Sequence, residues 1–326
     1  MSKHYLHIKD LKINFRDSEG KKEVLNIDEI KINKGQAFGL IGESGTGKTV
    51  LALTILKLIR IPPGEIESGE IIFDEENLLE KTEMEMRNDI RGKKIAMIFQ
   101  DPMSTLNPVF TVGQQMINVI TQNLGLNRKK AYDKAIETLE LVRLPDAKRT
   151  INKYPHELSG GQRQRVIIAL ALSCGAELII ADEPTRNLDV TIQAGILKLL
   201  KELEQSLDIT ILFIANNPEL VYWICDNVAV LYKGTIIEKG TTEEVIKNPV
   251  HPYTYALLNA IPKDKNEKIN LQGLTTRNVE ESDEGCIYYH RCAKRENICK
   301  EKLEFVKVKG THYVKCWKSK VGDING

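Results

Sequence analysis

A glycine-rich segment that ends in a lysine and a threonine is the most informative feature of the sequence. It reads GESGTGKT over residues 42–49 and matches the phosphate-loop pattern G-x-x-x-x-G-K-[ST] in full. Glycines let consecutive backbone N–H groups wrap phosphate oxygens, and a following helix adds positive potential. Lys48 is suited to neutralise the β and γ oxygens of a nucleoside triphosphate, and Thr49 to bind Mg²⁺. The residues expected to contact the nucleotide are Gly42, Ser44, Gly45, Gly47, Lys48 and Thr49.

Two acids follow an apolar segment further along the chain. Asp182 and Glu183 come directly after the residues LIIA at 178–181, so they are expected at the carboxyl edge of a sheet, where phosphates bind. Asp182 is suited to hold Mg²⁺, directly or through water, and Glu183 to polarise the attacking water as a general base. Such a pair also fits a solvated strand end, but the phosphate loop upstream favours the catalytic interpretation.

A third motif, LSGGQRQR at residues 158–165, precedes an apolar helix. Ser159 is well suited to cap that helix, and the two glycines after it leave the first helical N–H groups open to an anion. An ordinary capped helix is the alternative. The phosphate loop already accounts for one bound nucleotide. A second helix start suited to bind an anion must therefore serve some other ligand.

The hydrophobic pattern places these motifs on alternating strands and helices, which favours a mostly parallel sheet with helices on its faces. A helical insert is predicted from about residue 111 to 144, and two antiparallel strands near the N-terminus, over residues 6–15 and 24–32. The remaining predictions are strands at 36–42, 95–100, 178–182 and 209–215 and helices at 48–59 and 190–206.

Composition excludes several classes of protein. The 326 residues include 46 Lys+Arg and 45 Asp+Glu, and a net charge of +1 gives no reason to expect nucleic acid as a partner. The N-terminal residues lack the apolar core of a signal peptide. The longest uncharged apolar stretch, residues 166–176, is well short of the roughly 20 residues that cross a bilayer. The sequence predicts a chain that neither is exported nor spans a membrane.

Taken together, the motifs resemble the nucleotide-binding subunits of ABC transporters, and among them the oligopeptide, dipeptide and nickel importer group. The resemblance also includes RGKKIAMIFQDPMSTLNP with Gln100, YPHELSGGQRQR, and HPYTYALLNAIP at residues 251–262. It implies an α/β P-loop NTPase domain over residues 1–262, with a mixed sheet core, an antiparallel β subdomain and a helical subdomain at about 103–175. A linker and a cysteine-rich module would follow over residues 263–326.

The resemblance also implies a head-to-tail dimer that sandwiches two ATP molecules. Gln100 would contact Mg²⁺ and water, and Phe15 would stack on adenine, although a stray strand-end aromatic is an equal alternative. The resemblance implies that Ser159, Gly160, Gly161 and Gln162 contact the nucleotide bound by the partner subunit. Asp189, which this sequence shares with the family pattern, is also expected to contact nucleotide.

The same resemblance implies the assembly in which the chain works. Its partners would be a second ATPase subunit, two membrane permease subunits and, indirectly, a substrate-binding protein, at the cytoplasmic face of the membrane. An ABC-type ATPase acting on DNA or ribosomes would carry a coiled-coil insert or tandem cassettes, and the sequence has neither. Peptides are the expected cargo, with nickel or metal chelates as alternatives.

One position departs from the family pattern in a way that bears on catalysis. Asn216 stands where family members carry a histidine that contacts the γ-phosphate, and Asn cannot carry positive charge or shuttle a proton. Arg186 and Asn187 likewise replace small residues. We expect ATP at this chain's own phosphate loop to be hydrolysed slowly, in an asymmetric heterodimer. The alternatives are that Asn216 replaces the histidine adequately, that the loop is misaligned, or that the subunit is chiefly regulatory.

The last motif is a cluster of cysteines near the C-terminus. The four cysteines have 5, 6 and 16 residues between them, and their resemblance to a module of some peptide-importer ATPases implies a [4Fe–4S] cluster. Zn²⁺ and unliganded thiols are the alternatives. The predicted cluster ligands are Cys286, Cys292, Cys299 and Cys316.

Overall fold

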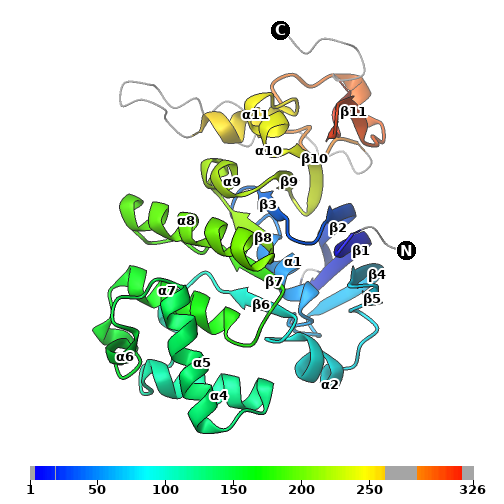
Figure 1. Ribbon diagram of the computed structural model, residues 1–326. Helices are drawn as coiled ribbons and strands as arrows, with labels where there is room; N and C mark the ends of the chain where they lie inside the picture. Colours follow the sequence, from blue (N-terminus) through cyan, green and yellow to red (C-terminus); the bar gives the residue numbers. More distant parts are fainter. Residues whose placement is uncertain (1–3, 19, 261–284, 318–326) are drawn as a thin grey trace.

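The computed structural model describes residues 4–18, 20–260 and 285–317, which form two sheets and a set of helices (Figure 1). The small sheet has the strand order β2-β1-β4-β5, and the large sheet has the order β11-β12-β10-β9-β3-β8-β7-β6. A mixed sheet, an antiparallel sheet and a helical region were expected from the sequence, and this fold class is confirmed.

The small sheet is antiparallel throughout its described pairs. Alternating apolar residues of β1 and β2 are fully buried and face the first helix of the chain, as the period-2 pattern requires. The strand expected at residues 6–15 is β1, which has a register shift after Ile13. The strands are β1 (Leu6–Asp17), β2 (Gly20–Ile32), β4 (Gly64–Phe73) and β5 (Glu76–Asn77).

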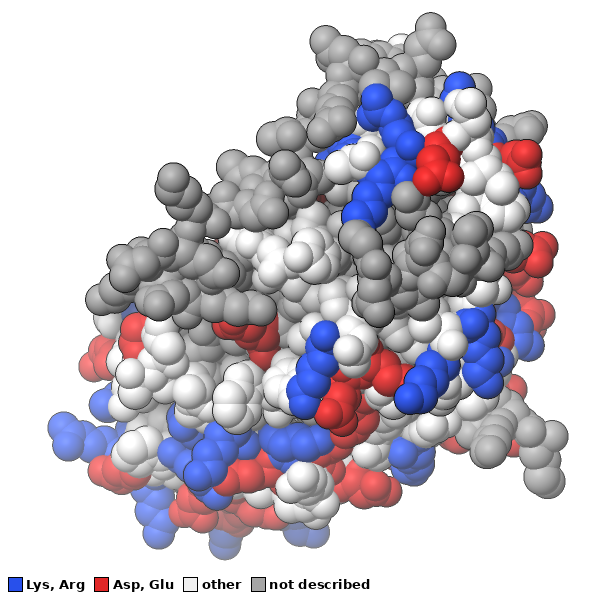
Figure 2. Space-filling view, turned by 90° about the horizontal axis from the view of Figure 1, so that it is seen from above, with Lys and Arg blue, Asp and Glu red and all other residues white. Residues whose placement is uncertain are grey.

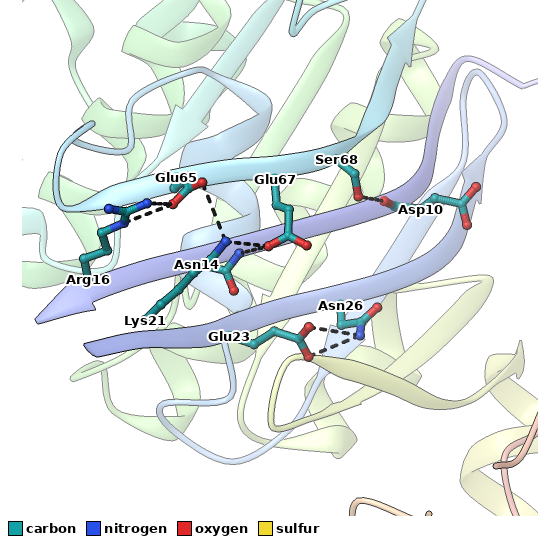
Figure 3. A network of polar contacts seen from close by, with 9 residues as sticks. All are labelled: Asp10, Asn14, Arg16, Lys21, Glu23, Asn26, Glu65, Glu67 and Ser68. Carbon is teal, nitrogen blue, oxygen red and sulfur yellow. Dashed lines mark hydrogen bonds and ion pairs between the residues drawn. The ribbon is translucent and has the colours of Figure 1, made fainter. Parts of the chain in front are cut away.

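Polar side chains join the strands of this sheet near the end of β1 (Figure 3). Glu67 on β4 accepts hydrogen bonds at 2.7 Å from Asn14 on β1 and from Lys21 on β2. Arg16 pairs with Glu65 at 3.1 Å. Exposed ion pairs stabilise little individually, but these contacts tie all three strands together on both sides of Phe15.

The large sheet is parallel at its centre and antiparallel at one edge. Strands β3, β7 and β8 are buried along their whole length, the pattern of parallel strands covered by helices on both faces. Successive residues of β3 point into two different cores: Ala37 and Ile41 into one, Phe38 and Leu40 into the other. The strands are β3 (Ala37–Ile41), β6 (Ile95–Ile98), β7 (Leu178–Asp182), β8 (Thr210–Ala215), β9 (Asn227–Tyr232) and β10 (Thr235–Thr241).

Helices cover both faces of this sheet. Helix α1 lies between the two sheets, where Leu51, Ala52 and Ile55 are fully buried. Helices α8 and α9 pack against the other core. These helices are α1 (Lys48–Ile55), α8 (Val190–Leu207), α9 (Pro218–Ile224), α10 (Thr242–Lys247) and α11 (Pro252–Asn259).

A helical region is inserted between β6 and β7 and lies at the bottom of Figure 1. Its longer helices begin at residues whose side chains accept a backbone N–H, namely Thr111, Asn127 and Ser159. None of the helices in the described part of the chain is both long and apolar enough to cross a membrane. The helices here are α3 (Pro102–Thr105), α4 (Val112–Leu124), α5 (Arg128–Leu141), α6 (Ala147–Thr150), the 3₁₀ turn Pro155–Glu157 and α7 (Gly160–Leu172), with α2 (Glu83–Glu85) and the π-turn Met86–Ile90 lying before β6.

The C-terminal segment, defined here as residues 285–317, joins the large sheet. Its strands β11 (Val306–Lys309) and β12 (His312–Val314) form a hairpin, and β12 pairs with β10, where Glu238 lies opposite Val314. Buried Glu238 also contacts His312 at 2.7 Å. A separate module was expected, but these strands continue the main sheet. The predicted linker at 263–284 lies outside the described residues.

Acidic and basic side chains are interspersed over the described part of the face nearest the C-terminal segment (Figure 2). This mixture agrees with the near-zero net charge of the sequence. The face therefore gives no electrostatic reason to bind a polyanion.

Candidate nucleotide-binding site

The segments that carry the predicted chemistry leave the sheet at one edge. In the register of the parallel strands, Ile41 lies beside Ala215, Ile214 beside Asp182, and Ala181 beside Ile98. The residues that follow these strand ends begin the phosphate loop, the Asn216 turn, the Glu183 turn and the segment with Gln100. Ligands of open α/β sheets bind at this carboxyl edge.

Two glycines of the phosphate loop are required by its backbone. Gly47 caps α1 with a φ of 103°, a left-handed conformation that side-chain-bearing residues rarely adopt. A Cβ atom on Gly42 would lie 2.3 Å from the carbonyl oxygen of Leu231. The loop therefore fits closely between β3 and β9, with Ser44 and Gly45 exposed at its tip.

Lys48 is buried beneath this loop, with only 5% of its surface exposed. Its Nζ donates hydrogen bonds to the carbonyl oxygens of Gly42 at 2.9 Å and Glu43 at 2.7 Å. Burial lowers the pKa of Lys48 to about 8, although the carboxylates of Glu183, Asp182 and Glu43 oppose this shift. A cation held this way lies ready for phosphate oxygens.

Thr49 and Asp182 form the candidate Mg²⁺ site. The Thr49 hydroxyl donates a 2.8 Å hydrogen bond to Asp182 Oδ2, and Asp182 is 2% exposed. Burial raises the pKa of this carboxyl group, because removing a charge from water is costly. A hydroxyl and a carboxylate are hard oxygen ligands of the kind Mg²⁺ prefers, so the donor set fits the ion. Bound Mg²⁺ would favour the ionised form of Asp182.

Glu183 is held by two neighbours. Asn216 Nδ2 donates a 2.5 Å hydrogen bond to Glu183 Oε1, and Arg186 Nη1 lies 3.4 Å from Oε2. Glu183 also has a φ of 45°, which is strained for a residue with a side chain. The buried Asn216 Oδ1 has no hydrogen-bond partner among the described residues. The structure thus brings the predicted base together with the residue predicted to replace the histidine.

The third motif begins α7 as predicted. Ser159 is exposed and forms a capping box with Gln162: the serine hydroxyl accepts the Gln162 N–H at 3.3 Å, and the glutamine Oε1 accepts the Ser159 N–H at 3.1 Å. A Cβ on Gly161 would lie 2.6 Å from Ile192, so α7 approaches the start of α8 closely. Asp189 caps α8 by accepting the Ile192 N–H at 3.0 Å. Gly160 is half-buried, and a Cβ atom on it would lie 3.2 Å from the Leu188 side chain.

Gln100 and Phe15 lie on different elements of the fold. Gln100 follows β6 by two residues and is half-buried. Phe15 pairs with Gly64 across the small sheet and packs partly against the core beneath it. The structure assigns neither residue a polar contact that defines its role.

Sequence reasoning missed three residues around the phosphate loop. Both guanidinium nitrogens at the end of the Arg291 side chain donate to the Glu43 carboxylate, at 2.9 and 2.8 Å. The Glu43 N–H donates to the Tyr253 hydroxyl at 2.9 Å. Tyr253 lies within the HPY motif, which was read only as a family resemblance, and no sequence signal pointed to Arg291.

The predicted [4Fe–4S] cluster is wrong. The four C-terminal cysteines line one small pocket, but the described residues contain no group of three or more Cys, His, Asp or Glu side chains that could hold a metal ion. The residues present therefore do not fit an iron–sulfur cluster or Zn²⁺. Within the described residues no disulfide joins any of the six cysteines.

Comparison with known proteins decides the family. A family profile described as ABC transporter matches residues 25–186, and one described as Oligopeptide/dipeptide transporter, C-terminal region, matches residues 237–299. The oligopeptide transport ATP-binding protein OppD of Bacillus subtilis is 41% identical over 316 residues, covering 96% of this chain and 88% of that protein. The chain belongs to the ATP-binding subunits of ABC transporters.

Other members of the ABC family support the assignment. The probable D,D-dipeptide transport ATP-binding protein DdpD of Escherichia coli is 41% identical, covering 91% of this chain and 92% of that protein. The ATP-binding cassette MJ0796, solved as a dimer bound to ADP and Pi, has a TM-score of 0.64 and 25% identity, covering 73% of this chain and 98% of that one.

Family membership confirms several predictions at a coarser level. The chain is an ABC ATPase whose ligands are ATP and Mg²⁺. It works with membrane permease subunits and a substrate-binding protein, and so acts peripherally at the membrane.

Proposed function

We propose that this ABC ATPase powers the import of peptides. The relatives at about 40% identity are named for oligopeptide or D,D-dipeptide transport, and the C-terminal region matches the profile of that group. Nickel and metal chelates are the competing cargoes. The test is uptake by the reconstituted transporter: MgATP-dependent uptake of short peptides supports the proposal, and uptake of nickel alone contradicts it.

The observation that carries the proposed ATPase role is the convergence at the sheet edge. Lys48 lies under the phosphate loop, Thr49 is hydrogen-bonded to Asp182, and Glu183 comes directly after the strand that ends at Asp182. In this proposal Thr49, Asp182 and Gln100 hold Mg²⁺, and Glu183 positions and deprotonates the attacking water. The remaining nucleotide contacts are proposed for Phe15, Gly42, Ser44, Gly45 and Gly47.

A second ATPase subunit would complete this site. Ser159 is exposed at the start of α7, and the ATP-binding cassette MJ0796 was solved as a dimer with ADP and Pi. A helix start with open N–H groups favours the γ-phosphate of a nucleotide held by the other subunit. We propose that Ser159, Gly160, Gly161 and Gln162 serve the partner's ATP, with Asp189 fixing the turn beside them.

The two subunits are proposed to differ, because Asn216 weakens the site on this chain. Its amide donates to Glu183 at 2.5 Å, so this N–H is engaged with the base instead of the γ-phosphate. An amide supplies no positive charge for the transition state. Arg186 holds the other carboxylate oxygen of Glu183.

Restoring the histidine tests this proposal. Asn216→His in the complex of both ATPase subunits is expected to raise kcat for ATP by on the order of 100-fold, the lower end of the range for one preorganised charge-stabilising contact. Asn216→Gln is the matched control, because it lengthens the side chain without adding charge. An unchanged rate with histidine refutes the weakened site.

A regulatory subunit that binds ATP without useful turnover is the competing function. Retention of Glu183 favours catalysis, and Glu183→Gln in this chain alone distinguishes the two. A fall in the ATPase rate of the complex supports a catalytic site here. No change supports the regulatory role.

A further inference from the structure

Glu43, the second residue of the phosphate loop, is a point where four groups meet. Its carboxylate accepts both hydrogen bonds from Arg291, and its N–H donates to Tyr253. Its carbonyl oxygen accepts from Lys48 Nζ at 2.7 Å and from the Thr46 hydroxyl at 2.9 Å. The conformation of Glu43 therefore determines where the carbonyl that holds Lys48 lies.

Arg291 belongs to the C-terminal segment and is itself firmly placed. Only 10% of its side chain is exposed, against 32% for Glu43. Its guanidinium lies 5.5 Å from the ring centre of Tyr232 on β9 and 5.7 Å from that of Tyr288. A planar guanidinium between aromatic rings loses little freedom when it binds a carboxylate in bidentate fashion.

The same aromatic cluster holds Tyr253. Its ring centre lies 4.6 Å from that of Tyr232 and 5.5 Å from that of Tyr288, and Tyr253 is fully buried. Tyr288 and Arg291 come from the C-terminal segment, Tyr253 from α11 and Tyr232 from β9. One rigid cluster thus carries both side chains that grip Glu43.

The charge of Glu43 makes this contact matter for nucleotide binding. A carboxylate at the start of a phosphate loop repels a triphosphate unless a cation neutralises it, and the low dielectric of a partly buried site strengthens that repulsion. Arg291 neutralises the carboxylate without occupying the loop, since it approaches Glu43 from the C-terminal segment.

We propose that Arg291 is a positioning residue for the phosphate loop, through which the C-terminal segment sets the affinity of this ATPase for nucleotide. Arg291 keeps Glu43 neutralised and oriented, which places the Glu43 carbonyl against Lys48. The segment is then part of the nucleotide site, although it is 248 residues away from Glu43 in sequence.

Binding of MgADP to the full chain, measured by calorimetry, tests the proposal. Arg291→Ala is expected to weaken binding roughly tenfold. In the assembled transporter the same change is expected to raise KM for ATP by a similar factor and leave kcat within about twofold. Arg295→Ala is the matched control: it removes the same charge from the same segment, where Arg295 lies 5.8 Å from the ring of Tyr289.

The double variant Arg291→Ala with Glu43→Gln shows whether weaker MgADP binding comes from the uncompensated Glu43 carboxylate or from a general loss of folding. If an uncompensated carboxylate causes the loss, the double variant binds MgADP more tightly than Arg291→Ala alone. Thermal unfolding of each variant checks the fold, and Arg291→Lys, which keeps the charge but loses the bidentate geometry, serves if Arg291→Ala does not fold. The proposal is overturned if Arg291→Ala binds as the Arg295→Ala control does, or if Glu43→Gln restores nothing.

Discussion

Proton uptake on nucleotide binding is the sharpest consequence of the buried Lys48. With a pKa of about 8, about one tenth of the amine is neutral at pH 7 and about nine tenths at pH 9. Phosphate oxygens favour the charged form, so nucleotide bound at pH 9 must bring a proton to Lys48. We expect about 0.9 protons taken up per nucleotide at pH 9 and about 0.1 at pH 7.

The size of the shift sets the pH dependence of affinity. The pKa falls from 10.5 to about 8, and one unit corresponds to 1.36 kcal/mol, so burial, after the partial offset by nearby carboxylates, disfavours the charged amine by about 3 kcal/mol. The nucleotide supplies the missing counter-charge. Between about pH 7 and pH 8 the amine is mostly charged and affinity changes little; above pH 8 affinity falls by up to about tenfold per pH unit.

Calorimetry of MgADP binding in buffers of different ionisation enthalpy measures these protons directly. The phosphate itself titrates near pH 6, so the pH range above 7 isolates the protein groups. Lys48→Arg is the control, because a guanidinium stays charged throughout. Uptake that is equal at pH 7 and pH 9, or that survives in Lys48→Arg, would refute the reasoning.

Two further predictions concern residues around the loop. His251 is 1% exposed and burial lowers its pKa to about 3, so only the unfolded chain binds this proton between pH 6.5 and 3. Stability should therefore fall by up to about 1.4 kcal/mol per pH unit below pH 6.5, and urea unfolding should show a shallower fall for His251→Asn. Gly42→Ala should abolish MgADP binding or destabilise the fold, because its Cβ would lie 2.3 Å from the Leu231 carbonyl oxygen. Gly195→Ala, inside α8, should leave both thermal stability and MgADP binding intact.

Local elements and their order could be predicted from the sequence because each depends on neighbours in the chain. The apolar run before Asp182 gave a strand with the predicted bounds, 178–182. The helix predicted from Val190 begins there because Asp189 caps it. Ser159 was likewise expected as a cap from its residue type and place.

Contacts between distant residues could not be predicted in this way. Asn216 and Glu183 were known to lie at strand ends, but their hydrogen bond depends on the register of β7 and β8. Strands β11 and β12 are only four and three residues long, too short for their apolar pattern to indicate that β12 pairs with β10. The cysteine spacing indicated which side chains could bind a metal but not how their sulfur atoms lie relative to one another. The predicted [4Fe–4S] cluster was therefore wrong.

Arg291 and Asn216 are proposed to affect different steps of the ATPase cycle because they contact different residues. Arg291 contacts Glu43, whose carbonyl holds Lys48, a residue suited to bind the phosphates of ATP, so its effect belongs to nucleotide affinity. Asn216 contacts Glu183, the proposed base, so its effect belongs to the chemical step. Loss of uniform binding raises KM, whereas loss of a contact made in the transition state lowers kcat. A change in KM alone therefore bears on the C-terminal segment and leaves the asymmetry of the two ATPase sites unaddressed.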